Sequence, residues 1–364
     1  MSRIVSCEVS RVVSRCPPRY RGHVFSLVSS SRPSAQATLR ILRPLLRSAP
    51  GAWESSEPLE RVVARAESPA VAPCTLLEVA GARPIVEADT PTVSAFLDGV
   101  QRSRVLGHHD GTPLVYATVA AAIRERVDRS LHTWREPVVR PLLLVSQRAL
   151  GAVWWHQLAD AGIPLADIDA SDDTGEASDI HPHAYRARAL AQVSLEREQL
   201  ERQLAARWCS EEARWLWIDG GISGNIALEV HARAFGVVKS HNTLYGDADS
   251  VRRVLALREG ERSAAFLVGH RLRRAVASWY LRWRAPMAGD PLFGLVRVEV
   301  VPPPAVLDAD VPATVLDEFS WHCDRLSAAI LLERHPVSLP DTRWHTLAYG
   351  VYAVESYLKA LIGS

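Results

Sequence analysis

Trp215-Leu-Trp-Ile-Asp219-Gly-Gly221 is a short apolar run that ends in one carboxylate and two glycines. The pattern predicts a buried strand with Asp219 at its tip, since glycine so often marks the point where regular structure ends. Val93-Ser-Ala-Phe-Leu-Asp98-Gly99-Val100 has the same design, and its glycine permits a turn or a close backbone approach. Asp98 and Asp219 are therefore predicted to act as a pair.

Two strand-borne aspartates, joined by an acid from a nearby helix, form a suitable site for a hard divalent cation. Mg²⁺ and Mn²⁺ prefer carboxylate oxygen atoms and keep water molecules that substrate phosphates can replace. Sites of this kind cleave phosphodiester bonds. The alternative is that each Asp-Gly dipeptide is a simple turn, which is the commoner meaning of either dipeptide alone.

Residues 185–207 are predicted to form an amphipathic helix that packs on the sheet. Its apolar residues recur at helical spacing on one face, and they are Leu190, Val193, Leu200 and Leu204. Glu201 lies at the border of this face, whereas Glu198 points further toward solvent. Ordinary surface charge is the alternative for both glutamates, and it suits Glu198 better.

The strands predicted over residues 278–284 and 294–300 alternate apolar or aromatic residues with arginine. Alternation predicts one face in the core and one basic face. Aromatic and arginine side chains together suit single-stranded nucleic acid, so Arg282 and Arg284 are candidate contacts. A half-exposed sheet edge without any ligand is an equal alternative.

Phe235-Gly-Val-Val-Lys239-Ser-His241 predicts another strand that is followed by two polar candidates. Only two of the 42 basic residues are lysines, so Lys239 stands out. We expect Lys239 and His241 to lie against a nucleic-acid strand.

These segments, in this order, resemble the NurA nuclease family. Phe-Leu-Asp-Gly at residues 96–99 precedes an Arg- and Glu-rich helix, Trp-Ile-Asp-Gly-Gly at 217–221, Gly-Val-Val-Lys-Ser-His at 236–241 and a Tyr-rich final helix. The resemblance implies an α/β protein with an RNase H-like mixed sheet flanked by helices. It also implies a Mn²⁺- or Mg²⁺-dependent DNA nuclease of DNA end processing or phage defence. Its implied partner is a HerA-like hexameric ATPase.

The resemblance also implies which residue type on the predicted helix binds the metal. The family places a metal-binding glutamate on the helix upstream of the second Asp-Gly, where Glu201 and Glu198 both match. Asp98, Asp219 and one of these glutamates would then hold the metal.

A tyrosine and a histidine near the C-terminus complete the family's site. This chain offers Tyr349 or Tyr352, together with His345, but no adjacent Tyr-His pair. Glu355 is therefore a candidate for the last metal ligand, since RNase H-like folds often take an acid from a late helix.

Composition narrows the protein class. The chain has 364 residues, 48% of them hydrophobic and 23% charged, as in soluble globular proteins. The net charge of +1 means that any nucleic acid must bind to local basic patches. The five cysteines form no Cys-x-x-Cys pair, so neither a disulfide framework nor a structural zinc site is expected. A cytoplasmic location is expected, and without a long uncharged apolar run we expect no membrane span.

We expect an Arg-, Ser- and Pro-rich extension over residues 1–90 and the nuclease-like domain over residues 91–364. Residues 1–50 resemble a transit peptide in composition, but a flexible arm or an over-long gene start is the preferred explanation. Within the extension, residues 35–47 predict an amphipathic helix and residues 74–79 a short edge strand.

Periodicity and turn signals predict the remaining strands and helices. Strands are predicted at 96–100, 104–108, 114–123, 226–230, 235–240 and 264–268, with a hairpin at His109-Asp-Gly111. Helices are predicted at 142–161, 251–258, 310–332 and 341–359, and an acidic loop at 167–179. In the helix at 310–332, Trp321 and Leu326 are expected to face inward.

Three functions are considered. The first is the metal-dependent deoxyribonuclease, which the presence of all three acids favours. The second is a non-catalytic DNA-binding or assembly subunit of the same fold. The third is an unrelated α/β enzyme that binds phosphate at Asp219-Gly-Gly221, and it is weak because no Gly-rich phosphate loop follows.

A homodimer is also expected. The family resemblance supplies most of the reason. The sequence adds eleven tryptophans, of which Trp208, Trp215 and Trp321 stand in polar contexts and are candidate interface anchors.

Overall fold

The computed structural model describes residues 35–48, 69–86, 90–128, 130–169, 181–223, 228, 233–270, 273–287, 290–308, 310–334 and 345–363. These residues belong to one compact unit, Ser34–Ser364. The expected boundary at residue 91 is wrong, because strands at residues 75–76 and 82–84 pair with strands at residues 261–270 of the later chain. The predicted extension therefore contributes to the main sheet.

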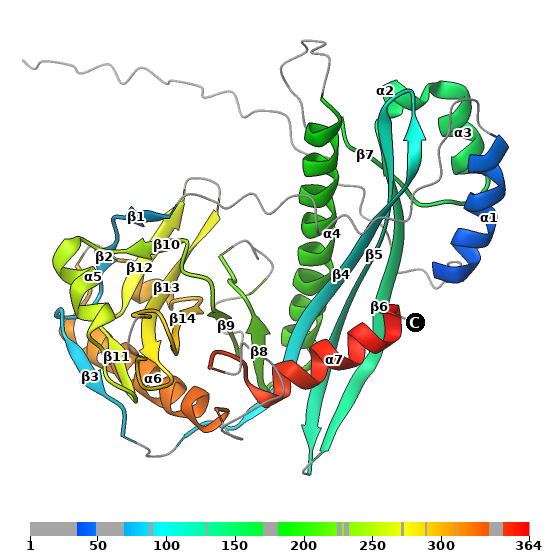
Figure 1. Ribbon diagram of the computed structural model, residues 1–364. Coiled ribbons are helices and arrows are strands. Elements are labelled where there is room, and N and C mark those ends of the chain that lie inside the picture. Colours follow the sequence, from blue (N-terminus) through cyan, green and yellow to red (C-terminus); the bar gives the residue numbers. More distant parts are fainter. Residues whose placement is uncertain are drawn as a thin grey trace, which may run out of the picture. The chain divides into compact units, whose positions relative to one another are not determined.

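The described residues form a mixed sheet of twelve strands (Figure 1). Ten of them follow one another in the order β2-β12-β13-β14-β9-β8-β4-β5-β6-β7, while β11 pairs with β13 and with β3. Their bounds are β2 (Thr75–Leu76), β3 (Ala82–Pro84), β4 (Val93–His109), β5 (Thr112–Val127), β6 (Ser130–Val145), β7 (Leu165–Asp167), β8 (Trp215–Asp219), β9 (Ala234–Val238), β11 (Glu261–Ser263), β12 (Phe266–His270), β13 (Arg273–Arg282) and β14 (Leu295–Val300). A separate parallel pair joins β1 (Ala70–Ala72) to β10 (Thr243–Tyr245).

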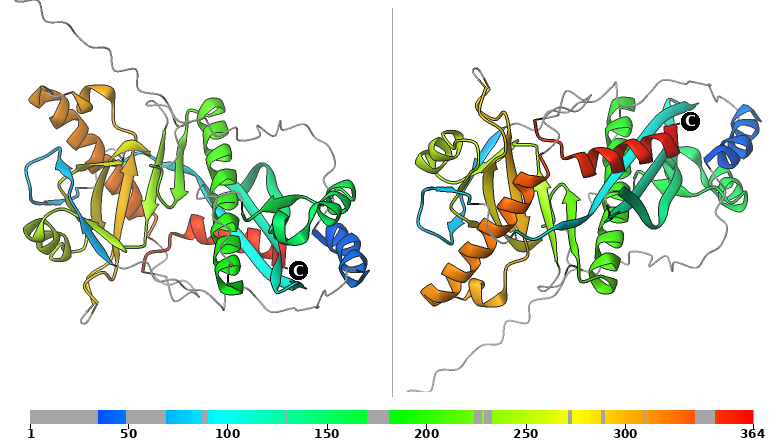
Figure 2. Two further views of the ribbon diagram at one scale, coloured as in Figure 1. Left: turned by 90° about the horizontal axis from the view of Figure 1, so that it is seen from above. Right: turned by 90° about the horizontal axis from the view of Figure 1, so that it is seen from below.

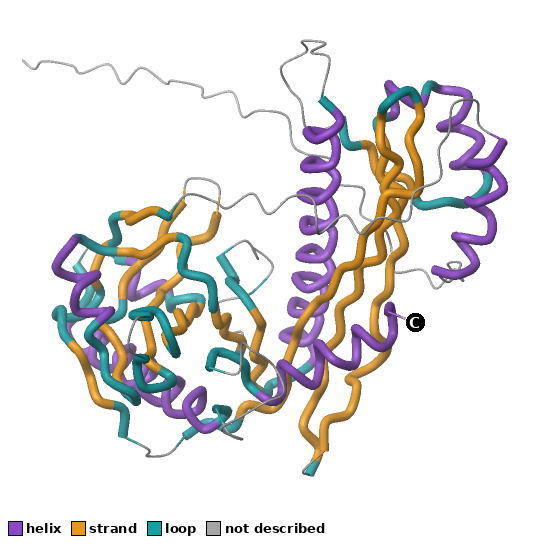
Figure 3. Tube along the Cα trace, viewed as in Figure 1, coloured by secondary structure: helices purple, strands orange, loops and turns teal. Residues whose placement is uncertain are grey.

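The helices pack beside this sheet (Figure 3). They are α1 (Ala35–Ser48), α2 (Gln147–Leu150), α3 (Ala152–Asp160), α4 (Pro182–Glu211), α5 (Ala248–Leu255), α6 (Ala313–Leu332), α7 (Tyr349–Gly363) and the 3₁₀ turn η2 (Pro304–Leu307). None of the helices in the described ranges combines the length and the apolar character needed to cross a lipid bilayer.

The centre of the sheet consists of three long antiparallel strands followed by two parallel ones. β4 pairs antiparallel with β5, and β5 pairs antiparallel with β6. After α4 the chain returns as β8, which lies parallel to β4, and β9 lies parallel to β8. Figure 2 shows these strands from above and from below. This order brings the two Asp-Gly segments onto neighbouring strands.

Helices α4 and α7 cover opposite faces of β4, because successive side chains of a strand point to opposite sides. Ala95 and Leu97 share a buried cluster with Val193 and Leu200 of α4. Phe96 and Val100 share another with α7 residues, namely Val351, Val354 and Leu358. Each face of the strand that carries Asp98 is therefore covered by a helix.

Several predicted elements are confirmed. α4 contains the predicted helix at 185–207, and Val193, Leu200 and Leu204 of its apolar stripe are buried. β14 covers all but the first residue of the strand predicted at 294–300, and α1 matches the helix predicted at 35–47, with Leu42 fully buried. The hairpin at Asp110-Gly111 has the positive φ angles of 47° and 77° that its sequence predicts.

The two strands predicted at 96–100 and 104–108 are in fact one strand, β4. Asp98 and Gly99 pair with Ala122 and Ala121 without interruption, so this Asp-Gly is no turn. The helix predicted at 142–161 is also wrong in part. Residues 142–145 end β6, and Gly151, with a φ of 80°, separates α2 from α3.

Three further predictions need correction or lie outside the described residues. Trp321 is 54% exposed, because it lies about 200° around α6 from the buried Phe319. The final helix begins at Tyr349, after a turn at residues 345–346. Most of the strand predicted at 226–230 and of the loop predicted at 167–179 falls outside the described residues.

Gly350 is required where α7 meets β4. A Cβ added at Gly350 would lie 2.4 Å from the Phe96 ring, whereas a Cβ at Gly363 of the same helix would meet its nearest atom, Arg102 Nη1, at 3.9 Å. We expect Gly350→Ala to lower the free energy of unfolding by about 1–3 kcal/mol through overpacking. Gly363→Ala, the matched control, should leave it unchanged or raise it, since alanine favours a helix. Denaturant unfolding of both variants measures this, and equal stabilities would contradict the packing argument.

Candidate functional site

Asp98 is a buried carboxylate in the middle of β4. Only 7% of the residue is exposed, and its Oδ1 accepts a hydrogen bond from the Gly99 backbone N–H at 2.7 Å. Burial raises the pKa of Asp98 well above its ordinary value, and the negative charge of Asp219 raises it further. The Lys239 charge opposes these effects, while Glu201 adds to them. Asp98 is thus an acid whose charged form is disfavoured until a cation joins it.

Asp219 ends β8, next to Asp98. Leu97 and Ile218 are partners in the parallel pairing of β4 with β8, and each is followed by an aspartate. The prediction that Asp98 and Asp219 lie on adjacent strands is therefore confirmed. The Lys239 ammonium Nζ lies 2.5 Å from Asp219 Oδ1, which forms an ion pair at the end of β9.

Two glycines shape the backbone that follows Asp219. Gly220 has a φ of 115°, and its N–H donates to the Val237 carbonyl oxygen at 2.9 Å. A Cβ at Gly236 would lie 2.5 Å from the Gly220 carbonyl oxygen, so β9 has no room for a side chain there. This close approach holds the turn after Asp219 against β9.

Glu201 reaches the site from α4, on the other face of β4. It is 8% exposed, and a Cβ added at Gly99 would lie 2.1 Å from Glu201 Oε1. Gly99 is therefore required for this close approach. Burial raises the pKa of Glu201 to about 7, Asp219 and Glu198 raise it as well, and the paired Arg197 guanidinium opposes the shift.

Glu198 is the more exposed of the two helix glutamates, as predicted. Its side chain is 40% exposed and pairs with Arg202 at 2.8 Å. Of the two, Glu201 is therefore the acid that lies close to the aspartates.

A cleft of about 300 Å³ opens between α4 and the turn after Asp219. Its charged lining consists of four acids and three arginines, which are Glu198, Glu201, Asp219, Glu299, Arg197, Arg202 and Arg297. Backbone from Gly220 to Ser223 forms one wall. The cleft therefore places arginines beside Asp219, Glu198 and Glu201, while Asp98 is not among its lining residues.

Glu299 is a residue of this cleft that the sequence analysis missed. It is 2% exposed, and its Oε2 accepts the Ile222 N–H at 2.7 Å. Its Oε1 pairs with Arg297 Nη1 at 2.5 Å. Glu299 thus anchors the turn that follows Asp219. The sequence contained one signal for this role. Arg297 and Glu299 carry opposite charges two residues apart in an otherwise apolar strand.

No group of three or more His, Cys, Asp or Glu side chains within the described ranges is gathered as a metal-binding cluster. The arrangement gives a reason: Asp98 points to the α7 face of β4, Glu201 approaches Gly99 from the α4 face, and Lys239 is bound to Asp219. The donor chemistry nevertheless suits a hard cation. Carboxylate oxygen is the ligand that such a cation prefers, and a bound cation would favour the charged forms of these buried carboxylates, whose pKa values are raised.

The predicted C-terminal residues do not line this cleft. His345 stacks on the Phe293 ring, with centroids 4.4 Å apart. Tyr352 packs against the buried cluster of α7. Glu355 pairs with Lys359 at 2.8 Å on the helix that covers the Asp98 face. Their assignment to the site remains a prediction, and the cleft itself gives it no support.

The predicted basic face of β13 and β14 is wrong. Arg282 is fully buried, and its guanidinium donates to backbone carbonyls of Leu255, Leu257, Pro291 and Phe293. Arg284 is 8% exposed and donates to the Arg334 carbonyl. Both arginines are structural, because the second face of these strands is covered by other chain segments.

His241 is also partly buried. Its Nε2 lies 2.8 Å from the Leu295 carbonyl oxygen, and burial lowers the pKa of its imidazole. This histidine is therefore bound to the protein backbone and is a poor candidate for phosphate contact.

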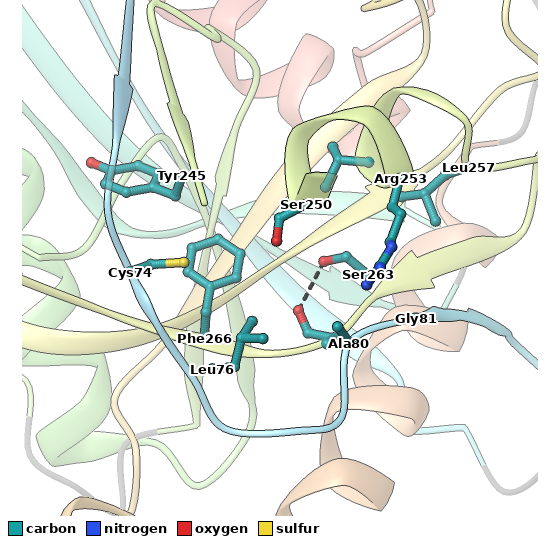
Figure 4. A pocket seen from close by; sticks show the side chains of 12 residues that line it. Cys74, Leu76, Ala80, Gly81, Tyr245, Ser250, Arg253, Leu257, Ser263 and Phe266 are labelled. Carbon is teal, nitrogen blue, oxygen red and sulfur yellow. Dashed lines mark hydrogen bonds between the residues drawn. The ribbon is translucent and has the colours of Figure 1, made fainter. Parts of the chain in front are cut away.

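Figure 4 shows a second, small pocket, which shares Tyr245 with the lining of the cleft. It is mainly apolar, and Leu76, Tyr245, Leu257 and Phe266 are among its lining residues. Cys74 also faces it, but burial raises the pKa of this thiol and makes it a weak nucleophile. The described cysteines, Cys74, Cys209 and Cys323, are free thiols.

The candidate interface tryptophans differ in exposure. Trp208 is fully buried, and Trp215 is partly buried against Phe235 and His322. Trp321 is exposed, with the Arg325 guanidinium 4.5 Å from its ring centroid. Trp208 is therefore excluded as an anchor.

Comparison of the chain with protein-family models gives no match, and comparison with curated proteins gives none either. The functional argument therefore depends on the geometry of the site.

The pKa of Glu201 predicts a pH dependence of stability. Between its ordinary value of 4.5 and its folded value of about 7, the folded protein retains a proton that the unfolded chain has released. This contribution is complete below pH 4.5 and is lost as the pH rises to about 7. We expect the metal-free protein to lose stability across this window and Glu201→Gln to reduce that loss. Denaturant unfolding between pH 4 and 8 measures it, and Glu198→Gln, at a 40% exposed side chain, is the control. A wild-type pH profile for Glu201→Gln would contradict the assignment.

Proposed function

We propose that the protein is a metal-dependent DNA nuclease. The observation that carries this proposal is the placement of two aspartates, the buried Asp98 and the partly exposed Asp219, side by side on parallel strands. Burying like charges together is costly unless a cation neutralises them. Neighbouring carboxylates with a raised pKa occur mostly at active sites and binding sites.

The strand order is a second support. β4, β5 and β6 adjoin as antiparallel strands with an aspartate in the first, and the second aspartate follows on β8 beside β4. This is the arrangement expected of an RNase H-like sheet. We therefore include an RNase H-like fold and a NurA-type nuclease in the proposal.

Asp98 and Asp219 would hold the metal, with Glu201 as the nearest helical acid. When bound, Mn²⁺ or Mg²⁺ supplies Lewis acidity toward phosphate oxygen and lowers the pKa of water. The chain itself contributes the rest. Glu299 fixes the turn after Asp219 through the Ile222 N–H. Arg197, Arg202 and Arg297 line the cleft, each paired with one of its glutamates, and a DNA phosphate would exchange with these carboxylates for the guanidinium groups.

The proposed partners and biological role follow from the family resemblance. A homodimer, a HerA-like hexameric ATPase and a role in end processing or phage defence are the corresponding expectations. The competing function, a non-catalytic DNA-binding or assembly subunit, predicts DNA binding without metal-dependent cleavage. Cleavage of labelled DNA by the wild-type protein with Mn²⁺, with and without a chelator, separates the two.

Asp98→Asn tests the site directly. We expect it to lower metal-dependent cleavage by orders of magnitude, because it removes a ligand. It should also stabilise the metal-free protein, because burial and Asp219 disfavour the Asp98 charge. The control is Asp110→Asn, a change at a hairpin tip where the side chain is 79% exposed. Cleavage of labelled DNA and thermal unfolding without metal give both results. Wild-type cleavage by Asp98→Asn would contradict the proposed function.

A further inference from the structure

Lys239 occupies an unusual position for a residue expected to contact substrate. It follows β9, its side chain is 19% exposed, and its Nζ lies 2.5 Å from Asp219 Oδ1. Its charge also acts on Asp98, the second aspartate of the pair. The ammonium therefore lies where the two carboxylates need a cation most.

The local backbone holds Lys239 in this place. Val237 pairs with Asp219 across β8 and β9, and Gly220 donates to the Val237 carbonyl. Lys239 is the first residue after β9, and the pairing of that strand with β8 brings it to the end of β8. The ion pair is a consequence of strand register, which a flexible surface lysine would not show.

An ammonium and a divalent cation compete for the same carboxylate oxygen. Asp219 Oδ1 cannot keep a 2.5 Å contact with Lys239 and also give its full charge to a metal. The carboxylates repel each other without any cation, so a lysine at this point stabilises the metal-free protein. It must also weaken metal binding by the free energy needed to break its ion pair.

We propose that Lys239 is a built-in counter-cation of the aspartate pair, which a divalent metal displaces and thereby frees to contact the substrate phosphate. This inference rests on the proposed function, since it assigns regulation to the same site. Metal and lysine then compete for Asp219 Oδ1. A cation faces this carboxylate in both states, and the phosphate contact becomes available only when the metal is present.

We expect the loss of Lys239 to change metal affinity and metal-free stability in opposite directions. A lysine with only a structural role, or only a substrate-binding role, would not show both effects. Lys239→Gln should bind Mn²⁺ more tightly by about tenfold, since the metal no longer competes with an ammonium for Asp219 Oδ1. The metal-free variant should be less stable than wild type. The affinity gain and the stability loss arise from the same missing charge.

Calorimetric titration of Mn²⁺ into wild type and Lys239→Gln is the first measurement. Lys359→Gln is the matched control, because Lys359 is the chain's only other lysine and its 61% exposed side chain forms a solvent-screened pair with Glu355. We expect tighter binding in Lys239→Gln alone. Equal Mn²⁺ affinity in wild type and Lys239→Gln would overturn the inference and leave the proposed function intact. Absence of Mn²⁺ binding in both would overturn the proposed function as well.

Lysine labelling of the wild-type protein gives a second measurement that needs no variant. With only two lysines, reductive methylation followed by mass spectrometry assigns each rate without ambiguity. We expect Lys239 to react slowly without metal and several-fold faster with saturating Mg²⁺, while the Lys359 rate stays constant. An unchanged Lys239 rate under conditions where calorimetry shows metal binding would overturn the inference.

Discussion

Repulsion between two neighbouring carboxylates is the constraint on which the rest of this site depends. Asp98 and Asp219 are brought together by the parallel pairing of β4 with β8, and the burial of Asp98 reduces the screening of its charge by water. Positively charged residues around the site reduce that repulsion. Lys239 supplies a positive charge, and Arg197 does the same for the nearby Glu201.

Backbone geometry is as important as charge in this arrangement. Gly99 lets Glu201 touch the middle of β4, and Gly236 lets the turn after Asp219 lie on β9. Glu299 then fixes that turn by accepting the Ile222 N–H. The two Asp-Gly segments therefore use glycine for different reasons. The first needs close approach within a continuous strand, whereas Gly220 adopts a positive φ where a strand ends.

Much of this fold could be predicted from local pattern. The apolar stripe of α4 and the short apolar run of β8 depend on neighbours in sequence, so periodicity finds them. The inward position of Glu201 followed from the same stripe, because burial on a helix is set by angle.

The remaining features depend on contacts between distant residues. Alternation in β13 indicated two faces, but it did not indicate that carbonyls from residues 255–257 and 291–293 cover Arg282. The Lys239–Asp219 pair likewise requires the register of β8 with β9, which sequence spacing does not provide. Glu299 lies 77 residues from its partner Ile222, so its role appears only in three dimensions.

We propose that Asp98 and Asp219 form a divalent-cation site. The most direct measurement is an anomalous difference map from crystals of the full chain grown with Mn²⁺. We expect a strong peak in contact with both carboxylates, and the Lys239 ammonium withdrawn from Asp219. A map with Mn²⁺ bound only elsewhere, and with the Lys239–Asp219 pair intact, would contradict it.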